Sequence, residues 1–256
     1  VLDVDLNGTA TVSETTLADV ITGGSATTDR VTLLDSSSAA TFYPNTTGVE
    51  ILEVETVSGG AKISSLKNTT GVTTVEITDP AGAGFGTTVS EINGQTISIK
   101  THVTGDSGTG TDFSSSAIVL NTATGVTNTD VEISSALTSK QPDGDSLHAT
   151  AFTTNSGQFT ITDNALDDET TGDHYFAHSF SVGGTASTAK LTSLVLKGGG
   201  DSDTSTSKMD ANVLTISTGS HVNIGTVDAT DSKSSFDFSS AVLKTGATIT
   251  TGTADS

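Results

Sequence analysis

A ten-residue pattern that recurs along the chain constrains its fold more than any other feature. Residues 45–54 read Asn-Thr-Thr-Gly-Val-Glu-Ile-Leu-Glu-Val, residues 68–77 read Asn-Thr-Thr-Gly-Val-Thr-Thr-Val-Glu-Ile, and a looser copy occupies residues 123–133. Gly48 and Gly71 are 23 residues apart, about one coil of a β-solenoid, and Gly71 and Gly125 are 54 apart, about two coils with insertions. Such a period is typical of stacked repeats, none of which can bury its own apolar face alone.

The strand inside each copy alternates with a period of two. Val75 and Ile77 share one face and Glu76 points the other way, and Val131-Glu132-Ile133 has the same pattern. We therefore expect these valines and isoleucines to be buried and Glu76 and Glu132 to be exposed. If the first two copies stack, Glu53 and Glu76 lie about 4.8 Å apart on the outer face. Either water solvates the two carboxylates or a cation bridges them.

The remaining segments favour an all-β chain. Short alternating stretches such as Phe159-Thr160-Ile161 and Leu214-Thr215-Ile216 are separated by Gly, Asp, Ser and Thr. Residues 13–21 are the best helix candidate, with Ser13 as N-cap and Gly23 past the end. The predicted fold is a parallel β-helix or β-roll solenoid of short strands. Residues 140–145, Lys-Gln-Pro-Asp-Gly-Asp, interrupt any strand, so we expect two halves at 1–140 and 141–256.

Charge and composition exclude several functional classes. The 256 residues carry a net charge of −20, which argues against nucleic acid and anionic membranes as partners. The sequence contains no run of about 20 apolar residues, which is the length that a membrane-spanning helix needs. Cys is absent, and no Gly-x-Ser-x-Gly motif in a strand–turn–helix context occurs, so no nucleophile motif is found. Trp is absent, there are two Tyr and Arg30 is the single arginine, so the side chains that usually bind sugars are scarce. These features predict a non-enzymatic, extracellular protein.

Three stretches strengthen this prediction by resemblance. They are the repeat unit Gly-Val-Glu-x-Leu-x-Val, the segment Leu-Thr-Ser-Leu-Val-Leu-Lys-Gly at 191–198, and Val-Asp-Ala-Thr-Asp-Ser at 227–232. Over residues 43–138 and 190–256 the chain resembles the crystalline surface-layer proteins of Gram-negative bacteria and their calcium-dependent, type-I-secreted relatives, including the large RTX-type adhesins. The resemblance implies a parallel β-helix or β-roll, Ca²⁺ at Asp-rich turns, and assembly into a lattice outside the cell.

Calcium ligands are expected at isolated Asp clusters, because the RTX nonapeptide Gly-Gly-x-Gly-x-Asp is missing. Ca²⁺ takes six to eight oxygens from carboxylates and backbone carbonyls on flexible turns. Three Asp-rich, turn-forming stretches supply such oxygens, although Asp and Gly are also ordinary turn residues. The candidate ligands are Asp143, Asp145, Asp163, Asp167, Asp168, Asp173, Asp201 and Asp203.

The resulting functional prediction is a self-assembling, Ca²⁺-stabilised surface layer. Its main partner is the chain itself, in a homo-oligomeric lattice or filament, and a cell-surface polysaccharide is a further candidate partner. Two alternatives remain: a segment of a large adhesin or biofilm-matrix protein, and a β-helical polysaccharide-degrading enzyme or phage tail spike.

Overall fold

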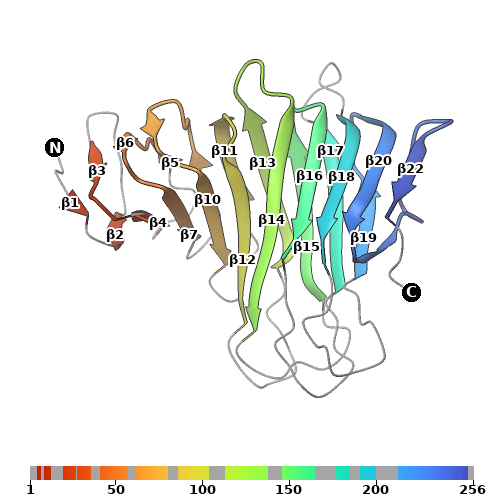
Figure 1. Ribbon diagram of the computed structural model, residues 1–256, viewed down its shortest axis with the longest axis horizontal. Coiled ribbons are helices and arrows are strands. Elements are labelled where there is room, and N and C mark those ends of the chain that lie inside the picture. Colours follow the sequence, from red (N-terminus) through yellow and green to blue (C-terminus); the bar gives the residue numbers. More distant parts are fainter. Residues whose placement is uncertain are drawn as a thin grey trace.

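The chain forms a parallel β-solenoid, as the sequence predicts. The computed structural model describes residues 5–6, 9–12, 20–26, 28–35, 41–56, 62–79, 86–103, 113–137, 146–164, 177–184, 191–199 and 213–252. Within these residues there is no helix, and all strand pairs are parallel. The strands stack along the long axis of the molecule, with the N-terminus at one end and the C-terminus at the other (Figure 1).

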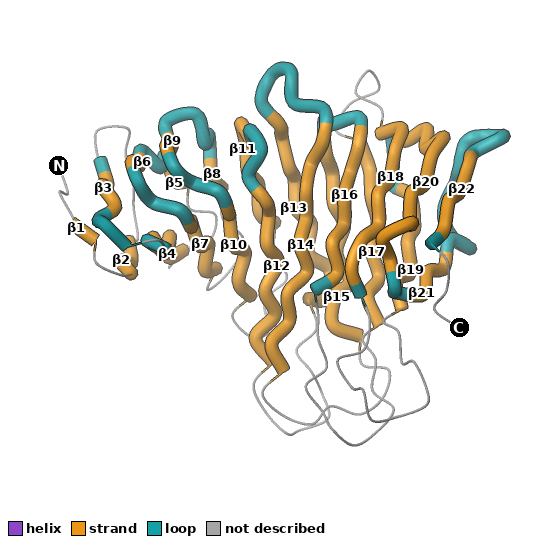
Figure 2. The backbone as a smooth tube through the Cα atoms, in the orientation of Figure 1, coloured by secondary structure: helices purple, strands orange, loops and turns teal. Residues whose placement is uncertain are grey.

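Three sheets make up the walls of the solenoid (Figures 1 and 2). The long sheet has ten strands: β2 (Thr9–Val12), β4 (Arg30–Asp35), β7 (Ile51–Thr56), β10 (Thr74–Asp79), β12 (Thr96–Val103), β14 (Asn128–Leu137), β16 (Gln158–Asp163), β18 (Leu191–Gly198), β20 (Val222–Ser232) and β22 (Thr248–Thr251). The second sheet has eight: β5 (Thr41–Phe42), β8 (Lys62–Ile63), β11 (Gly86–Ile92), β13 (Phe113–Thr122), β15 (Ser146–Thr154), β17 (Ala177–Gly184), β19 (Val213–Thr218) and β21 (Ser235–Asp237). The third sheet has four: β1 (Asp5–Leu6), β3 (Ile21–Gly23), β6 (Thr46–Thr47) and β9 (Thr69–Thr70).

The repeated Asn-Thr-Thr-Gly-Val unit builds the corner between the short third sheet and the long sheet. Thr46 pairs with Thr69 and Thr47 with Thr70, so the first two copies lie on neighbouring coils. The amide of Gly48 donates to the carbonyl of Thr70 at 2.9 Å, which joins the corners directly. Gly48, with φ of 66°, adopts the left-handed conformation that glycine tolerates best. The predicted stacking of the copies is therefore confirmed.

Coil length changes along the solenoid. Arg30 pairs with Ile51 and Ile51 with Thr74, so the early coils are short and nearly equal in length. Thr96 pairs with Asp130, which makes that coil clearly longer. The described strands of the short third sheet end at β9, and the later coils contribute strands to the other two sheets only. The stretch between the second and third copies of the repeat holds an intermediate coil at β12, as predicted.

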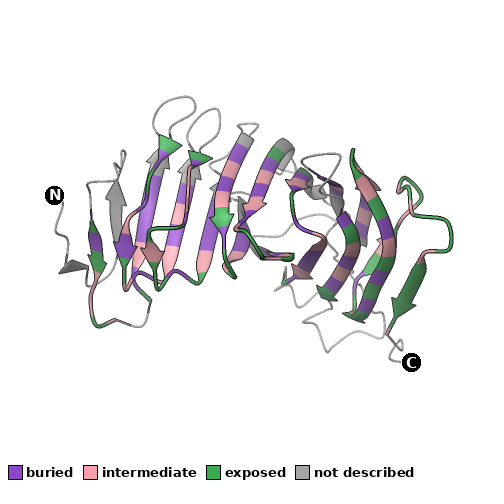
Figure 3. Cartoon of the chain, turned by 90° about the horizontal axis from the view of Figure 1, so that it is seen from above, coloured by how far each residue is buried: buried purple, intermediate pink, exposed green. Residues whose placement is uncertain are grey.

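Aliphatic columns inside the solenoid form its core, and the buried positions along the strands are purple in Figure 3. One column runs through Val31, Leu52, Val75, Ile97, Val131 and Ile161, which are paired in register and buried. A parallel column runs through Leu33, Val54, Ile77, Ile99 and Ile133. The predicted burial of Val75, Ile77, Val131 and Ile133 is confirmed.

Two other predictions are only partly covered by the described residues. The candidate helix at 13–21 lies largely outside them, and its last residue, Ile21, begins strand β3. The proposed division at residue 140 falls in the undescribed segment 138–145. On either side of it β13 pairs with β15 and β14 with β16. The division into two halves stays a prediction.

Candidate functional site

Two rows of outward side chains on the long sheet form the candidate site, and we call them the outer rows. They exist because paired parallel strands place equivalent positions above one another, with a shift of register between Val195 and Lys197 where β18 pairs with β20. The first row contains Arg30, Ile51, Thr74, Thr96, Asp130, Thr160, Val195 and Asp228. The second row contains Thr32, Glu53, Glu76, Ser98, Glu132, Thr162, Lys197 and Asp231.

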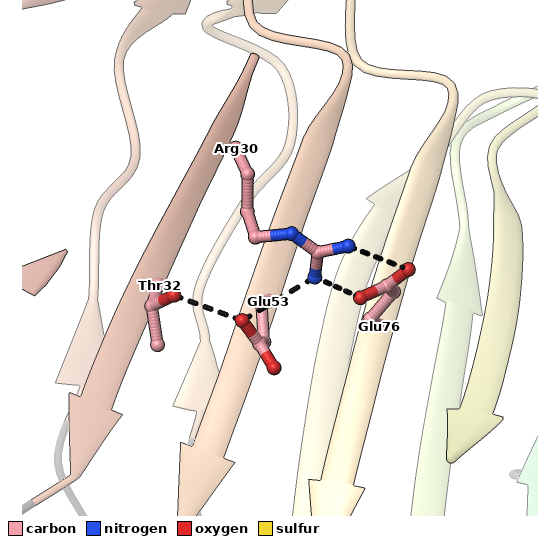
Figure 4. Close-up of polar contacts among 4 residues, drawn as sticks. All are labelled: Arg30, Thr32, Glu53 and Glu76. Carbon is pink, nitrogen blue, oxygen red and sulfur yellow. Dashed lines mark hydrogen bonds and ion pairs between the residues drawn. The ribbon is translucent and has the colours of Figure 1, made fainter. Parts of the chain in front are cut away.

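Arg30 forms ion pairs with both members of the acidic pair in the second row, Glu53 and Glu76, which lie on the next two coils (Figure 4). Arg30, on β4, forks onto both carboxylate oxygens of Glu76, with Nη2 at 3.3 Å from Oε1. Its Nη1 also lies 3.3 Å from Oε2 of Glu53, which sits on the strand between them. The hydroxyl of Thr32 donates to that same Glu53 oxygen at 2.9 Å. Three consecutive coils are thus joined by side chains as well as by the backbone ladder.

The expected exposure of Glu76 is wrong. Glu53 and Glu76 are paired neighbours, as the register requires, but Glu76 retains only 5% of its exposure. A guanidinium from within the chain bridges the two carboxylates. Glu132, by contrast, is only partly buried, and one of its oxygens accepts a hydrogen bond from Asn164 at 2.7 Å.

The electrostatics of the cluster keep Arg30 charged. The hydrogen bond with Glu76 raises the pKa of Arg30 above its ordinary value, partial burial opposes the shift, and the negative charges of Glu76 and Glu53 add to the rise. A fork of two donors onto one carboxylate is the strong geometry for an ion pair. The cluster therefore carries one positive and two negative formal charges when both glutamates are ionised.

Farther along, the outer rows carry exposed acids. Asp228 and Asp231 on β20 are exposed, and Asp130 on β14 is partly buried. The hydroxyl of Thr230, 2.6 Å from Asp228 Oδ1, lowers the pKa of that aspartate, and the Thr230 amide at 3.0 Å adds to the effect. Asp228 is therefore ionised at neutral pH. Lys197 is the basic residue among the outer-row positions from β12 to β20.

Of the eight aspartates predicted to bind calcium, the structure describes Asp163. It follows Ile133 in an inward column at the end of β16 and retains 2% of its exposure. Its Oδ2 accepts a hydrogen bond from the hydroxyl of Ser234 at 2.9 Å, and its carbonyl accepts one from the amide of Gly199 at 2.6 Å. The other seven lie outside the described residues: Asp143, Asp145, Asp167, Asp168, Asp173, Asp201 and Asp203. Calcium binding at these clusters stays a prediction.

Two other kinds of site are absent from the described residues. No group of three or more His, Cys, Asp or Glu side chains comes together there as a metal cluster. In the same ranges, no helix has the length and apolarity to cross a membrane.

Comparison with known proteins adds no assignment. No family model, no curated protein and no solved structure matches this chain.

Proposed function

We propose that this chain is a non-enzymatic extracellular structural protein that assembles with copies of itself into a surface layer stabilised by Ca²⁺. The observation that carries the proposal is the continuous ten-stranded parallel sheet, whose two outer rows bear Asp130, Glu132, Asp228 and Asp231. A regular, acidic wall of this kind offers repeated carboxylates to a neighbouring copy.

The ion pairs that the single arginine makes within the chain support a structural role for the protein. Enzymes and lectins that act on acidic or neutral sugars rely on Arg and aromatic side chains at their sites. Here Arg30 is committed to Glu53 and Glu76, and Trp is absent from the sequence. The phenylalanines Phe152, Phe159 and Phe180 pack on one another inside the solenoid, with ring centroids 5.3 and 5.7 Å apart. These groups stabilise the coil stack, and no aromatic side chain stands in the outer rows.

Charge explains why a divalent cation is part of the proposal. Copies with a net charge of −20 repel one another, and at physiological salt that repulsion extends only about 8 Å. Tight contact between acidic faces falls within that distance. Ca²⁺ can bind carboxylates from both sides of a contact, because it accepts six to eight oxygens in a flexible geometry. Mg²⁺ retains its waters and demands an octahedral site, so it is the poorer bridge.

Light scattering during a chelator titration tests this proposal. We expect removal of divalent ions to disperse the assembly and Ca²⁺ to restore it at lower concentration than Mg²⁺. Replacing the pairs Asp143/Asp145 and Asp201/Asp203 by Asn should raise the Ca²⁺ concentration required, whereas the control Asp237→Asn should leave it unchanged. Asp237 is exposed, and its Oδ1 accepts a hydrogen bond from the amide of Ser239 at 2.7 Å. Scattering that persists after all divalent ions are removed would exclude a calcium-bridged assembly.

A further inference from the structure

Two of the three N-glycosylation motifs in the chain are copies of the same tripeptide. The motif is Asn-x-Ser/Thr, in which x is not proline, and it accepts N-linked sugars in secreted proteins. It occurs at Asn7, Asn45 and Asn68. Asn7 lies outside the described residues, whereas Asn45 and Asn68 each begin the Asn-Thr-Thr of a repeat unit. The structural environments of these two asparagines can therefore be compared at identical acceptor sequence.

The copy at Asn45 is enclosed between two coils. It leads into β6, which lies between β3 and β9 in the third sheet. On one side the carbonyl of Asn45 accepts a hydrogen bond from the amide of Ile21 at 3.0 Å. On the other side the amide of Thr46 donates to the carbonyl of Asn68 at 3.2 Å. Asn45 is partly buried and Thr46 is buried, so this copy reaches an enzyme only when the coil opens.

The copy at Asn68 lies on an exposed turn at the edge of the same sheet. The amide and the hydroxyl of Thr69 both donate to the carbonyl of Leu66, at 3.1 and 2.7 Å, and so close a turn that contains Asn68. Asn68 and Thr70, the two residues that define the motif, are exposed. The strand that holds Thr70, β9, is the last described strand of the third sheet. An enzyme can therefore approach this copy without opening the solenoid.

The length of the next coil explains why this edge is open. Residues 64–73 pass the corner in ten residues, and residues 90–95 pass the same corner of the next coil in six, because the residues that flank the two stretches are paired. The shorter stretch cuts the corner, so the turn with Asn68 projects beyond it. The corner that carries Asn45, residues 43–50, is instead followed by the ten-residue stretch.

We propose that the folded chain accepts an N-linked glycan at Asn68 and shields Asn45. The donor is an oligosaccharide joined through pyrophosphate to a lipid carrier. Nδ2 of Asn68 forms a bond to the anomeric carbon of the first sugar, and the bond from that carbon to the pyrophosphate breaks. The pyrophosphate leaves with the bonding electron pair, and the amide gives one proton to a base of the transferase. The hydroxyl of the exposed Thr70 completes the motif that the transferase recognises.

The glycan site goes beyond the proposed surface layer and shares with it only the export of the chain. The corner at β9 belongs to the third sheet, whereas the outer rows belong to the long sheet. A glycan at Asn68 therefore leaves the acidic wall free for contacts between copies.

Glycan transfer by a purified oligosaccharyltransferase tests the site on dilute, folded protein. The protein carries Asn7→Gln, so that only the two repeat copies remain, and glycopeptides are quantified by mass spectrometry. Synthetic peptides of residues 42–49 and 65–72 are the unfolded references, and we expect both to be modified. With each rate divided by that of its peptide, Asn68 in the folded protein should react about tenfold faster than Asn45 or more, because Asn45 needs local opening.

Variants assign the signal to the motif. Asn68→Gln and Thr70→Ala should each abolish modification at this corner, whereas Asn45→Gln and Thr70→Ser should retain it. Equal normalised rates at the two asparagines would overturn the shielding of Asn45. A folded protein that stays unmodified at Asn68 while the 65–72 peptide reacts would overturn the acceptor site, as would a 65–72 peptide that does not react. The transfer needs no assembly, so its failure is distinct from a failure of the chelator titration.

Discussion

Arg30→Gln is expected to lower the free energy of unfolding by about 3 kcal/mol. Removing one partner of a buried ion pair typically costs about 3–5 kcal/mol, and the lower end applies here because Arg30 and Glu53 keep some contact with water. The variant would leave Glu53 and Glu76 side by side, with Glu76 almost fully buried. Denaturant unfolding followed by circular dichroism measures the change. Arg30→Lys keeps the charge but loses the fork, and it should recover only part of the stability.

A double-mutant cycle separates the ion pair from other effects of losing arginine. In the Glu76→Gln background, Arg30→Gln should cost about 2 kcal/mol less than in wild type, because the buried negative charge is no longer present. The matched control is Glu132→Gln, which changes an acid in the same outer row that Arg30 does not contact. Arg30→Gln should cost as much in that background as in wild type. An identical cost in the Glu76→Gln background would contradict the role of this cluster.

Val131→Asp should be still more destabilising, by about 4 kcal/mol, because an aspartate there would be an unpaired carboxylate in an apolar column. Val131 lies in the aliphatic column between Ile97 and Ile161 and is buried. Thr162→Asp is the matched control, since it adds the same charge at an outward position between Glu132 and Lys197. We expect the control to change stability by no more than about 0.5 kcal/mol. Similar melting of the two variants would contradict the assignment of Val131 to the inward face and Thr162 to the outward face.

The coil architecture could be predicted because short local sequence patterns determine it. The Asn-Thr-Thr-Gly-Val unit carries its own turn glycine, and the strand after it alternates with a period of two. Together they define the coil length and the inward face, which is why Val75 and Ile133 were placed correctly. Coil register beyond the clear repeats was not predictable to the residue. The coils from Thr96 to Asp228 are longer than the early ones, whereas the last described coil, from Asp228 to Thr250, is short again. The sequence does not mark where the extra residues leave the wall.

The candidate site shows where local reasoning ends. The alternating pattern correctly predicts that the Glu76 side chain points outward. An outward side chain is nevertheless buried when a long side chain from another coil lies over it. That side chain comes from Arg30, 46 residues earlier and two strands away. The sequence did contain a signal for this contact. Arg30 precedes Glu76 by 46 residues, which is twice the 23-residue spacing of the first two repeats.

Negative-stain electron microscopy of the purified protein tests the central claim most directly. The proposed surface layer predicts ordered sheets or filaments with a fixed repeat in CaCl₂, which disappear in excess chelator and return when Ca²⁺ is restored. Single, unordered particles in CaCl₂ at every protein concentration examined would contradict a self-assembling layer and would favour an adhesin segment.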